Sequence, residues 1–300
     1  MNTKVNIAGV ELKNPVMTAS GTFGSGMEFS EFTDLNKLGA VVTKGVANVP
    51  WEGNPTPRIA ETYGGMLNAI GLQNPGIELF VKRDLPFLEK YDTKVVVNVC
   101  GHSENDYIEV VERLADEKVD LLEINISCPN VKEGGIAFGQ NEKSVESITA
   151  AIKKVAKQPV IMKLSPNVTD ITVMAKAAEA GGADAISLIN TLTGMKIDVE
   201  RQRFALANKT GGMSGPAVKP VAVRMVYQAS NAVKIPVIGM GGISCAEDAI
   251  EFILAGATAV SVGTANFINP SVTSDIVDGI EDYMERHNVE DINSLIGLVK

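Results

Sequence analysis

The segment Asn125-Ile-Ser-Cys-Pro-Asn130 places Cys128 directly after an apolar run, at a point where proline prevents a strand from continuing. A cysteine thiol has an unperturbed pKa of about 8.5, so a modestly favourable field turns it into a thiolate base near neutral pH. The only histidines are His102 and His287. Neither shares a motif with Cys128, which argues against a Cys–His hydrolytic pair. Cys128 is therefore our candidate general base for abstracting a proton.

Polar, small or cationic residues follow each of eight apolar runs. They are Ser20, Lys44, Asn98, Asn125, Lys163, Asn190 with Thr191, Gly241 with Gly242, and Gly263 with Thr264. Each has an ordinary explanation when taken singly, because Asn and Ser start turns and Lys leaves a sheet for solvent. For Asn98 alone we prefer the turn. The carboxyl ends of barrel strands build active sites, however, so the whole set predicts a ring around one pocket.

Two glycine motifs near the C-terminus indicate phosphate binding. Gly239-Met-Gly-Gly-Ile-Ser244 and Ser261-Val-Gly-Thr-Ala265 follow the last two apolar runs, where barrels often bind phosphate on backbone N–H groups. The first motif lacks the final glycine of GxGxxG, so it supports a Rossmann dinucleotide site poorly. Plain tight turns remain the alternative for either motif alone. Two lysines in the same pocket would suit a phosphate, a carboxylate or a developing anionic ring.

Alternating strand-like and helix-like segments must position these residues. Continuous apolarity, typical of strands buried on both faces, occurs over residues 15–20, 40–45, 95–100, 121–127, 160–164, 185–190, 237–241 and 259–263. Helices are predicted over residues 107–117, 144–157, 171–180, 218–233 and 246–255. The alternation predicts a parallel α/β sheet, and the count of eight predicts closure into a (β/α)8 TIM barrel. An open doubly wound sheet is the competing fold.

Three further segments complete the expected architecture. Residues 5–12 read as a β-hairpin around an Ala-Gly turn, which would plug the N-terminal end of the barrel. The connections 46–94 and 191–216 are too long for simple turns, and we expect them to be functional loops at the C-terminal face. A helix is expected over residues 76–90, and residues 51–57 read as irregular.

The bulk composition limits the classes of function. The chain has 300 residues, 45% of them hydrophobic and 21% charged, with a net charge of −9, and we expect one domain over residues 1–300. An acidic surface argues against nucleic acid and anionic membranes as partners. No segment reads as a signal peptide or a bilayer span. Three widely spaced cysteines without CxxC predict a soluble, cytoplasmic protein with inert thiols at Cys100 and Cys245, and they cannot form an ordinary iron–sulfur cluster.

With these residues assembled, the chain resembles the class 1 dihydroorotate dehydrogenases over nearly its full length. The matching motifs are Thr18-Ala-Ser-Gly-Thr-Phe-Gly24, Thr43-Lys-Gly45, Asn68-Ala-Ile-Gly-Leu-Gln-Asn-Pro-Gly76, Asn125-Ile-Ser-Cys-Pro-Asn130, Lys163-Leu-Ser-Pro166, Asn190-Thr191, Gly211-Gly-Met-Ser-Gly-Pro216, Gly239–Ser244 and Val262-Gly-Thr264. Any one motif alone would be unspecific, whereas their order together is highly specific.

The resemblance implies oxidation of dihydroorotate to orotate on FMN, with Cys128 removing the C5 proton while the C6 hydride passes to flavin N5. FMN would contact Ser20, Lys44, Gly45, Asn98, Asn125, Lys163, Ile189, Gly215, Gly241, Gly242, Gly263 and Thr264. The last four would bind the phosphate. The substrate would contact Lys44, Asn68, Ala69, Ile70, Gly71, Leu72, Asn125, Asn190 and Thr191. No metal ligand is implied.

The finer likeness is to the NAD-linked class 1B catalytic subunits, which pair with a second subunit carrying FAD and a [2Fe–2S] cluster. A homodimer within a heterotetramer is then expected. The fumarate-reducing class 1A is the first alternative. A dihydrouridine synthase, a flavin barrel acting on tRNA, would need a basic surface that this sequence lacks. A non-catalytic phosphate- or flavin-binding barrel would need the glycine turns but not Lys44, Asn68, Asn125, Cys128 and Asn190.

Overall fold

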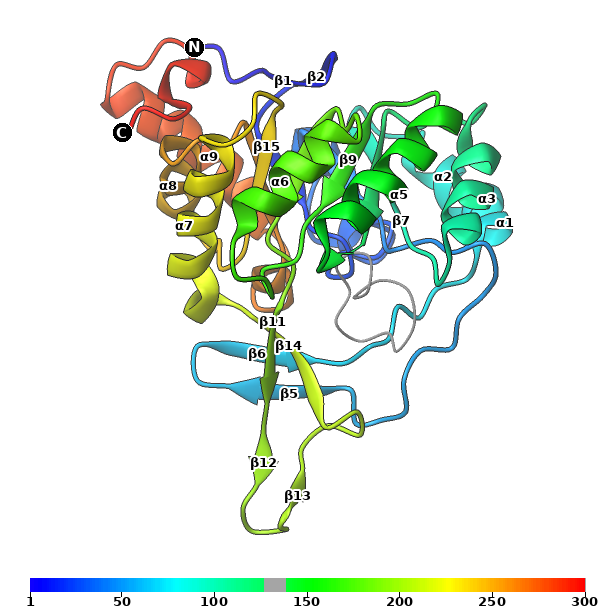
Figure 1. Ribbon diagram of the computed structural model, residues 1–300. Helices are drawn as coiled ribbons and strands as arrows, with labels where there is room; N and C mark the ends of the chain where they lie inside the picture. Colours follow the sequence, from blue (N-terminus) through cyan, green and yellow to red (C-terminus); the bar gives the residue numbers. More distant parts are fainter. Residues whose placement is uncertain (127–138, 300) are drawn as a thin grey trace.

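In the computed structural model, which describes residues 1–126 and 139–299, eight parallel strands form a closed barrel (Figure 1). Each strand pairs with the next one along the chain, and the last pairs with the first. The strands are β3 (Val16–Thr18), β4 (Ala40–Val42), β7 (Lys94–Val99), β8 (Leu121–Asn125), β9 (Val160–Lys163), β10 (Ala185–Leu188), β15 (Val237–Met240) and β16 (Ala259–Val262). Each of the eight predicted runs overlaps a barrel strand, so the barrel is confirmed and the open sheet was wrong.

Burial on both faces explains why these strands are continuously apolar. Every residue of β4, β8, β9, β10, β15 and β16 is buried. Inside, the side chains fill the barrel, and outside they pack against the helices. Most polar exceptions lie in the carboxyl-terminal half of their strands, so they gather toward one face of the barrel.

The helices alternate with the strands and cover the barrel from outside (Figure 1). The five predicted helices are confirmed as α3 (Glu104–Leu114), α5 (Glu142–Val155), α6 (Ile171–Ala180), α7 (Lys219–Ser230) and α8 (Ala246–Leu254). Side-chain caps set several of their starts. Ser103 and Asp106 form a capping box at α3, and Asn141 and Asp170 accept backbone N–H groups at α5 and α6.

Two further helical segments border the barrel. The expected helix over 76–90 is present as α1 (Ile77–Leu79), a π-helical turn (Phe80–Asp84) and α2 (Leu85–Leu88), without a break. Helix α9 (Val272–Arg286) was not predicted, and it packs against α8. No helix within residues 1–126 and 139–299 is long and apolar enough to cross a membrane.

The predicted N-terminal hairpin is confirmed as β1 (Val5–Ile7) and β2 (Val10–Leu12), which pair antiparallel. Ala8 and Gly9 form its turn, both with positive φ. The hairpin lies at the end of the barrel opposite to the long connections (Figure 1). Its side chains Val5, Ile7 and Leu12 are buried in the main core, so it covers that end of the barrel.

We expected the two long connections to be loops. They instead contain strands that pair in one antiparallel sheet. Residues 46–94 contribute β5 (Ile59–Thr62) and β6 (Gly65–Asn68), whereas residues 191–216 contribute β11 (Leu192–Met195) and β14 (Thr210–Ser214). Their order is β11-β14-β6-β5. The sheet has its own small core of Leu67, Ala69 and Leu206. It projects from the face where the barrel strands end (Figure 1).

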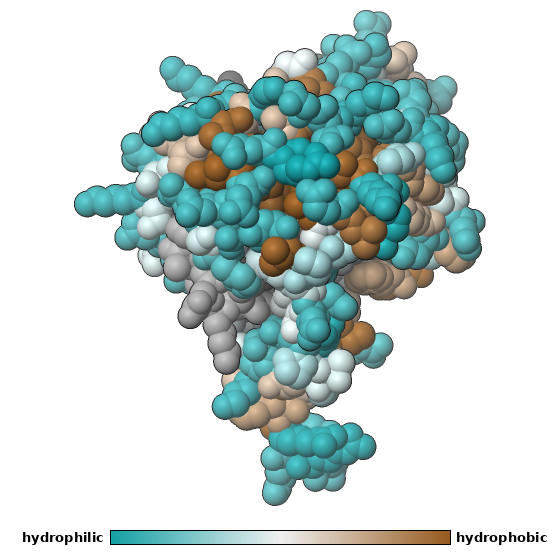
Figure 2. Space-filling view, turned by 90° about the vertical axis from the view of Figure 1, so that its right-hand side faces the viewer, coloured by the Kyte–Doolittle hydropathy of each residue, from teal (hydrophilic) through white to brown (hydrophobic). Residues whose placement is uncertain are grey.

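A short hairpin, β12 (Ile197–Asp198) and β13 (Arg203–Phe204), extends this sheet farthest from the barrel (Figure 1). Residues 199–204 at its tip are exposed. Figure 2 shows a hydrophilic surface at the end of the projection. The remaining connection, residues 51–57, holds only an isolated bridge from Trp51 to Asn74, as the irregular pattern predicted.

Candidate active site

A cavity of about 970 Å³ lies between the carboxyl ends of the barrel strands and the four-stranded sheet. Both long connections and most of the barrel strands contribute to its wall. The predicted site residues that line it are Ser20, Lys44, Asn68, Ile70, Gly71, Leu72, Asn125, Lys163, Ile189, Asn190, Thr191, Gly215, Gly241, Gly242, Gly263 and Thr264. Side chains and turns far apart in the sequence are therefore brought to one place, as the barrel hypothesis required.

Three predicted residues do not line the cavity. Asn98 is fully buried, and Gly45 lies so close to it that a Cβ on Gly45 would sit 2.9 Å from Asn98 Oδ1. Ala69 is buried in the small core of the four-stranded sheet. None of the three is among the residues that line the cavity, and their expected contacts with a ligand stay predictions.

The predicted Cys128 and Asn130 lie outside the described residues, as does everything from 127 to 138. What surrounds the gap is described. Asn125, the last residue of β8, is buried, and its backbone carbonyl accepts a hydrogen bond of 2.8 Å from the Tyr107 hydroxyl. Helix α3 therefore fixes the end of the strand from which the Cys128 segment departs.

Three asparagines form a hydrogen-bonded row, of which Asn190 and Asn125 line the cavity and Asn98 is buried beside them. Asn190 Nδ2 donates to Asn125 Oδ1 at 3.4 Å, and Asn125 Nδ2 donates to Asn98 Oδ1 at 3.5 Å. The backbone N–H of Thr191 donates to Asn190 Oδ1 at 2.7 Å. Amides both donate and accept, so such a row suits a flat ring bearing carbonyl and N–H groups.

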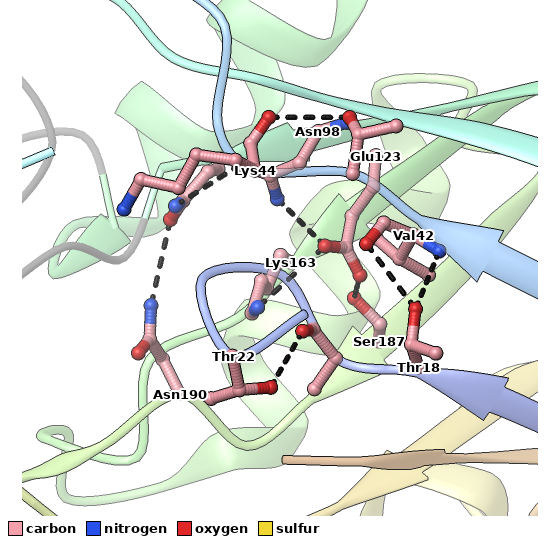
Figure 3. Close-up of polar contacts among 12 residues, drawn as sticks. Thr18, Thr22, Val42, Lys44, Asn98, Glu123, Lys163, Ser187 and Asn190 are labelled. Atoms are coloured by element: carbon pink, nitrogen blue, oxygen red, sulfur yellow. Dashed lines mark hydrogen bonds and ion pairs between the residues drawn. The ribbon is translucent and has the colours of Figure 1, made fainter. Parts of the chain in front are cut away.

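Two lysines approach this row from different strands (Figure 3). Lys44 follows β4, and its ammonium lies near Gly21, where a Cβ would be 3.7 Å from Nζ. Strands β3 and β4 are joined there by Thr18, whose Oγ1 accepts from the Val42 N–H at 2.9 Å. Lys163 ends β9 and is buried. The lysines give the cavity the cationic character that an anionic ligand needs.

The glycine turns form a backbone cradle at the end of the cavity. Gly241 and Gly242 have φ of 124° and 82°, values that side-chain-bearing residues rarely adopt. A Cβ on Gly242 would stand 2.7 Å from the Cβ of Lys219 and 3.0 Å from the carbonyl oxygen of Gly215. Opposite, the Thr264 hydroxyl donates to Ser214 Oγ at 2.7 Å. Only glycine fits the first turn, which keeps its backbone accessible to a ligand.

Asp248 anchors the turn after β15. Its Oδ2 accepts from the Ser244 N–H and hydroxyl at 2.8 and 2.9 Å, and its Oδ1 accepts from Lys219 Nζ at 2.6 Å. Burial alone would raise the pKa of Asp248, but these bonds outweigh it and hold that pKa below its ordinary value. Hydrogen bonds from Lys219 to Asp248 and Glu251 raise the pKa of the lysine. The cluster ties α7 and α8 to the cradle.

We expect Asp248→Asn to lower the melting temperature at neutral pH but to change little in acid. A folded-state pKa below the unfolded value of about 3.9 stabilises the fold fully above that pH, and the stabilisation is lost as pH falls through the folded pKa. Calorimetry of both proteins between about pH 2 and pH 7 measures this. A constant gap in melting temperature over the whole range would contradict the assignment.

Glu123 is a site component that was not predicted from the sequence. It lies in the middle of β8 with 2% of its side chain exposed, and it contacts Asn98, Lys163 and Ser187. The available signal was a lone carboxylate within the apolar run Leu121-Leu-Glu-Ile-Asn125, since a buried charge requires a partner. In the described part of the chain, His, Cys, Asp and Glu side chains form no cluster that could hold a metal ion.

Comparison with known proteins gives one consistent result. A family model described as dihydroorotate dehydrogenase matches residues 2–284. The chain is 73% identical, over 300 residues and all of both chains, to the protein named dihydroorotate dehydrogenase B (NAD(+)), catalytic subunit, from Lachnoclostridium phytofermentans. Its identity to the protein of the same name from Alkaliphilus oremlandii is 66%, covering 99% of this chain and 98% of that one.

A solved structure shows the same fold. It is DHODH from Eimeria tenella in complex with ferulenol, with a TM-score of 0.83, and the match covers 99% of this chain and 88% of that one. Its sequence identity of 24% is low, so this likeness concerns the fold.

Proposed function

This chain belongs to the dihydroorotate dehydrogenase family, and from that membership we propose that it is the catalytic subunit of an NAD-linked enzyme oxidising dihydroorotate to orotate in pyrimidine biosynthesis. One observation carries the proposal beyond family membership. A single cavity combines a glycine cradle, two lysines and a row of asparagine amides. These are the groups that a phosphate-bearing flavin and an anionic pyrimidine require.

The cavity residues fit FMN. The volume of about 970 Å³ is in the upper range of small-molecule sites and leaves room for a substrate beside the cofactor. Ser261 lines the cavity, and its buried Oγ has no hydrogen-bond partner among the described residues. We propose that Gly241, Gly242, Gly263 and Thr264 bind the phosphate. Contacts with the remainder of FMN would come from Ser20, Lys44, Asn125, Lys163, Ile189 and Gly215, with Gly45 and Asn98 behind them.

When bound, FMN would supply two-electron chemistry, as the acceptor of the hydride from C6 of dihydroorotate. The chain's own residues orient the substrate and take the proton. Lys44 offers a cation to the carboxylate, and the amides of Asn68, Asn125 and Asn190 offer donors and acceptors to the ring. Ile70, Gly71, Leu72 and Thr191 would close around it, supported by Ala69. Cys128 takes the C5 proton as general base, and loss of both hydrogens forms the C5–C6 double bond of orotate.

The word subunit in the relatives' names implies a partner. We propose that this partner carries FAD and a [2Fe–2S] cluster and passes the electrons to NAD+, and that two copies of the present chain join two partners. We further propose that residues 1–300 act as one FMN-binding domain, and that this domain works in the cytoplasm.

Anaerobic bleaching of the FMN-loaded chain by dihydroorotate tests the proposal. We expect the flavin absorbance to disappear, and to return only when NAD+ and the FAD/iron–sulfur subunit are added together. Return with fumarate alone would instead assign the chain to the fumarate-linked class. Bound FMN that dihydroorotate does not bleach would contradict the proposal and favour another flavin barrel, with dihydrouridine-containing tRNA as the next substrate to try.

A further inference from the structure

Glu123 is a buried carboxylate that the proposed chemistry does not use. Its side chain is 2% exposed, and it is not among the described residues that line the cavity. Moving a carboxylate into a barrel interior is costly unless other groups satisfy its charge and both its oxygens. An apolar residue would fill this position on β8 at lower cost, so the carboxylate calls for a functional explanation.

Both oxygens of Glu123 are occupied by partners from three other strands (Figure 3). Oε1 accepts a hydrogen bond of 2.6 Å from Asn98 Nδ2 on β7 and lies 3.5 Å from Lys163 Nζ on β9. Oε2 accepts a hydrogen bond of 2.8 Å from Ser187 Oγ on β10. The carboxylate therefore joins four consecutive barrel strands directly beneath the cavity.

Each contact connects Glu123 to a group that faces the cavity. Lys163 lines the cavity itself. Asn98 is hydrogen-bonded to Asn125, which is in turn hydrogen-bonded to Asn190. Asn125 and Asn190 both line the cavity. With 5% of its side chain exposed, Lys163 has little contact with water. The field that its ammonium exerts on a bound ligand is therefore set largely by the neighbouring carboxylate.

We propose that Glu123 is a positioning residue that fixes the ammonium of Lys163 and partly cancels its charge, so that the bound flavin keeps a lower reduction potential. The inference rests on the proposed function, in which Lys163 contacts FMN. Reduced flavin carries more negative charge than oxidised flavin, so a nearby cation favours reduction and a nearby anion opposes it. A lower potential suits a subunit whose electrons must continue to NAD+.

The test is the midpoint potential of FMN bound to the full-length Glu123→Gln variant, measured by spectroelectrochemistry. Removing the negative charge leaves the ammonium of Lys163 uncompensated. We expect the ratio of reduced to oxidised FMN at a fixed potential to rise at least tenfold, which is about 30 mV for a two-electron couple. Glu123→Asp keeps the charge and should lie closer to the wild type. Glu112→Gln removes an exposed charge from α3 and should not change the potential.

A potential that is the same in wild type and Glu123→Gln, with FMN bound to both, would overturn the inference. So would equal shifts in Glu123→Gln and Glu123→Asp, because a merely structural role does not distinguish them. Failure of the proposed function gives a different result. In that case the wild-type chain itself would bind no FMN or would resist bleaching by dihydroorotate.

Thermal unfolding gives a second test of whether Glu123 and Lys163 act as a charge pair. Each single variant, Glu123→Gln or Lys163→Gln, leaves one buried charge without its partner, whereas the double variant removes both. We expect the double variant to unfold at a higher temperature than either single variant. Additive losses in the three variants would show that the two side chains do not act as a pair.

Discussion

Cys128→Ala is expected to bind FMN as the wild type does and to lose most turnover with dihydroorotate at neutral pH. A positioned general base contributes roughly 10²- to 10⁴-fold to the rate, and the C5 proton of dihydroorotate is only weakly acidic. Without the thiolate, no group assigned to the site takes that proton. The flavin content of the variant measures FMN binding, and steady-state turnover with the partner subunit measures the loss of activity.

The serine variant of the same residue tests the chemistry more closely. Cys128→Ser should recover part of the activity only at high pH, because a hydroxyl is a much poorer base than a thiol. Cys245→Ser is the matched control, since that free thiol is exposed outside the proposed site. Near-wild-type turnover of the alanine variant would rule out Cys128 as the base. A flat pH profile of the serine variant would argue against proton abstraction at this position.

Gly242→Ala should weaken FMN binding by roughly ten- to a hundredfold, because a strained backbone position costs about 1–3 kcal/mol. The added Cβ would meet the Lys219 Cβ at 2.7 Å and the Gly215 carbonyl oxygen at 3.0 Å, at a φ of 82°. The cradle must then shift, and the backbone no longer meets the phosphate in the same way. Titration of the FMN-free chain with FMN, followed by flavin fluorescence, gives the dissociation constant.

Gly9→Ala provides the control for backbone strain alone. Gly9 has a similar φ of 90°, but a Cβ there meets nothing within 4 Å, and it lies in the hairpin at the other end of the barrel. This variant should lose stability and keep its affinity for FMN. A folded Gly242→Ala chain with the wild-type dissociation constant would show that the turn does not bind the phosphate.

The barrel could be predicted from the sequence because burial on both faces leaves a strong signal, a short run dominated by Val and Ala such as that of β4 or β16. The four-stranded sheet left no such signal. Its strands are short, partly exposed and interrupted by Gly65, Gly194, Gly211 and Gly212, and their pairing joins distant segments. Helix α9 was detectable, since Val272, Ile276, Val277, Ile280 and Met284 recur at helical spacing.

The sequence predicts a site residue where an unusual residue type follows an apolar strand. The lysines, asparagines and glycines at the cavity wall belong to this group. The sequence does not distinguish residues that line the cavity from residues that are buried next to them. Asn98 and Asn125 stand at the ends of similar apolar runs, yet Asn125 lines the cavity whereas Asn98 is fully buried and donates to Glu123. That difference depends on where each strand ends relative to its neighbours in the closed barrel.

The pairing of β6 with β14 also has a consequence for how the protein is made. Asn68 and Gly212, hydrogen-bonded across this pair, are 144 residues apart in the chain. The ribosome must therefore synthesise more than two thirds of the chain before β14 can pair with β6. Strand β16 must then follow before the barrel can close on β3. Such long-range pairing folds slowly, because loop closure precedes the contacts that reward it. A ligand that needs the complete cavity can consequently bind only after most of the chain has folded.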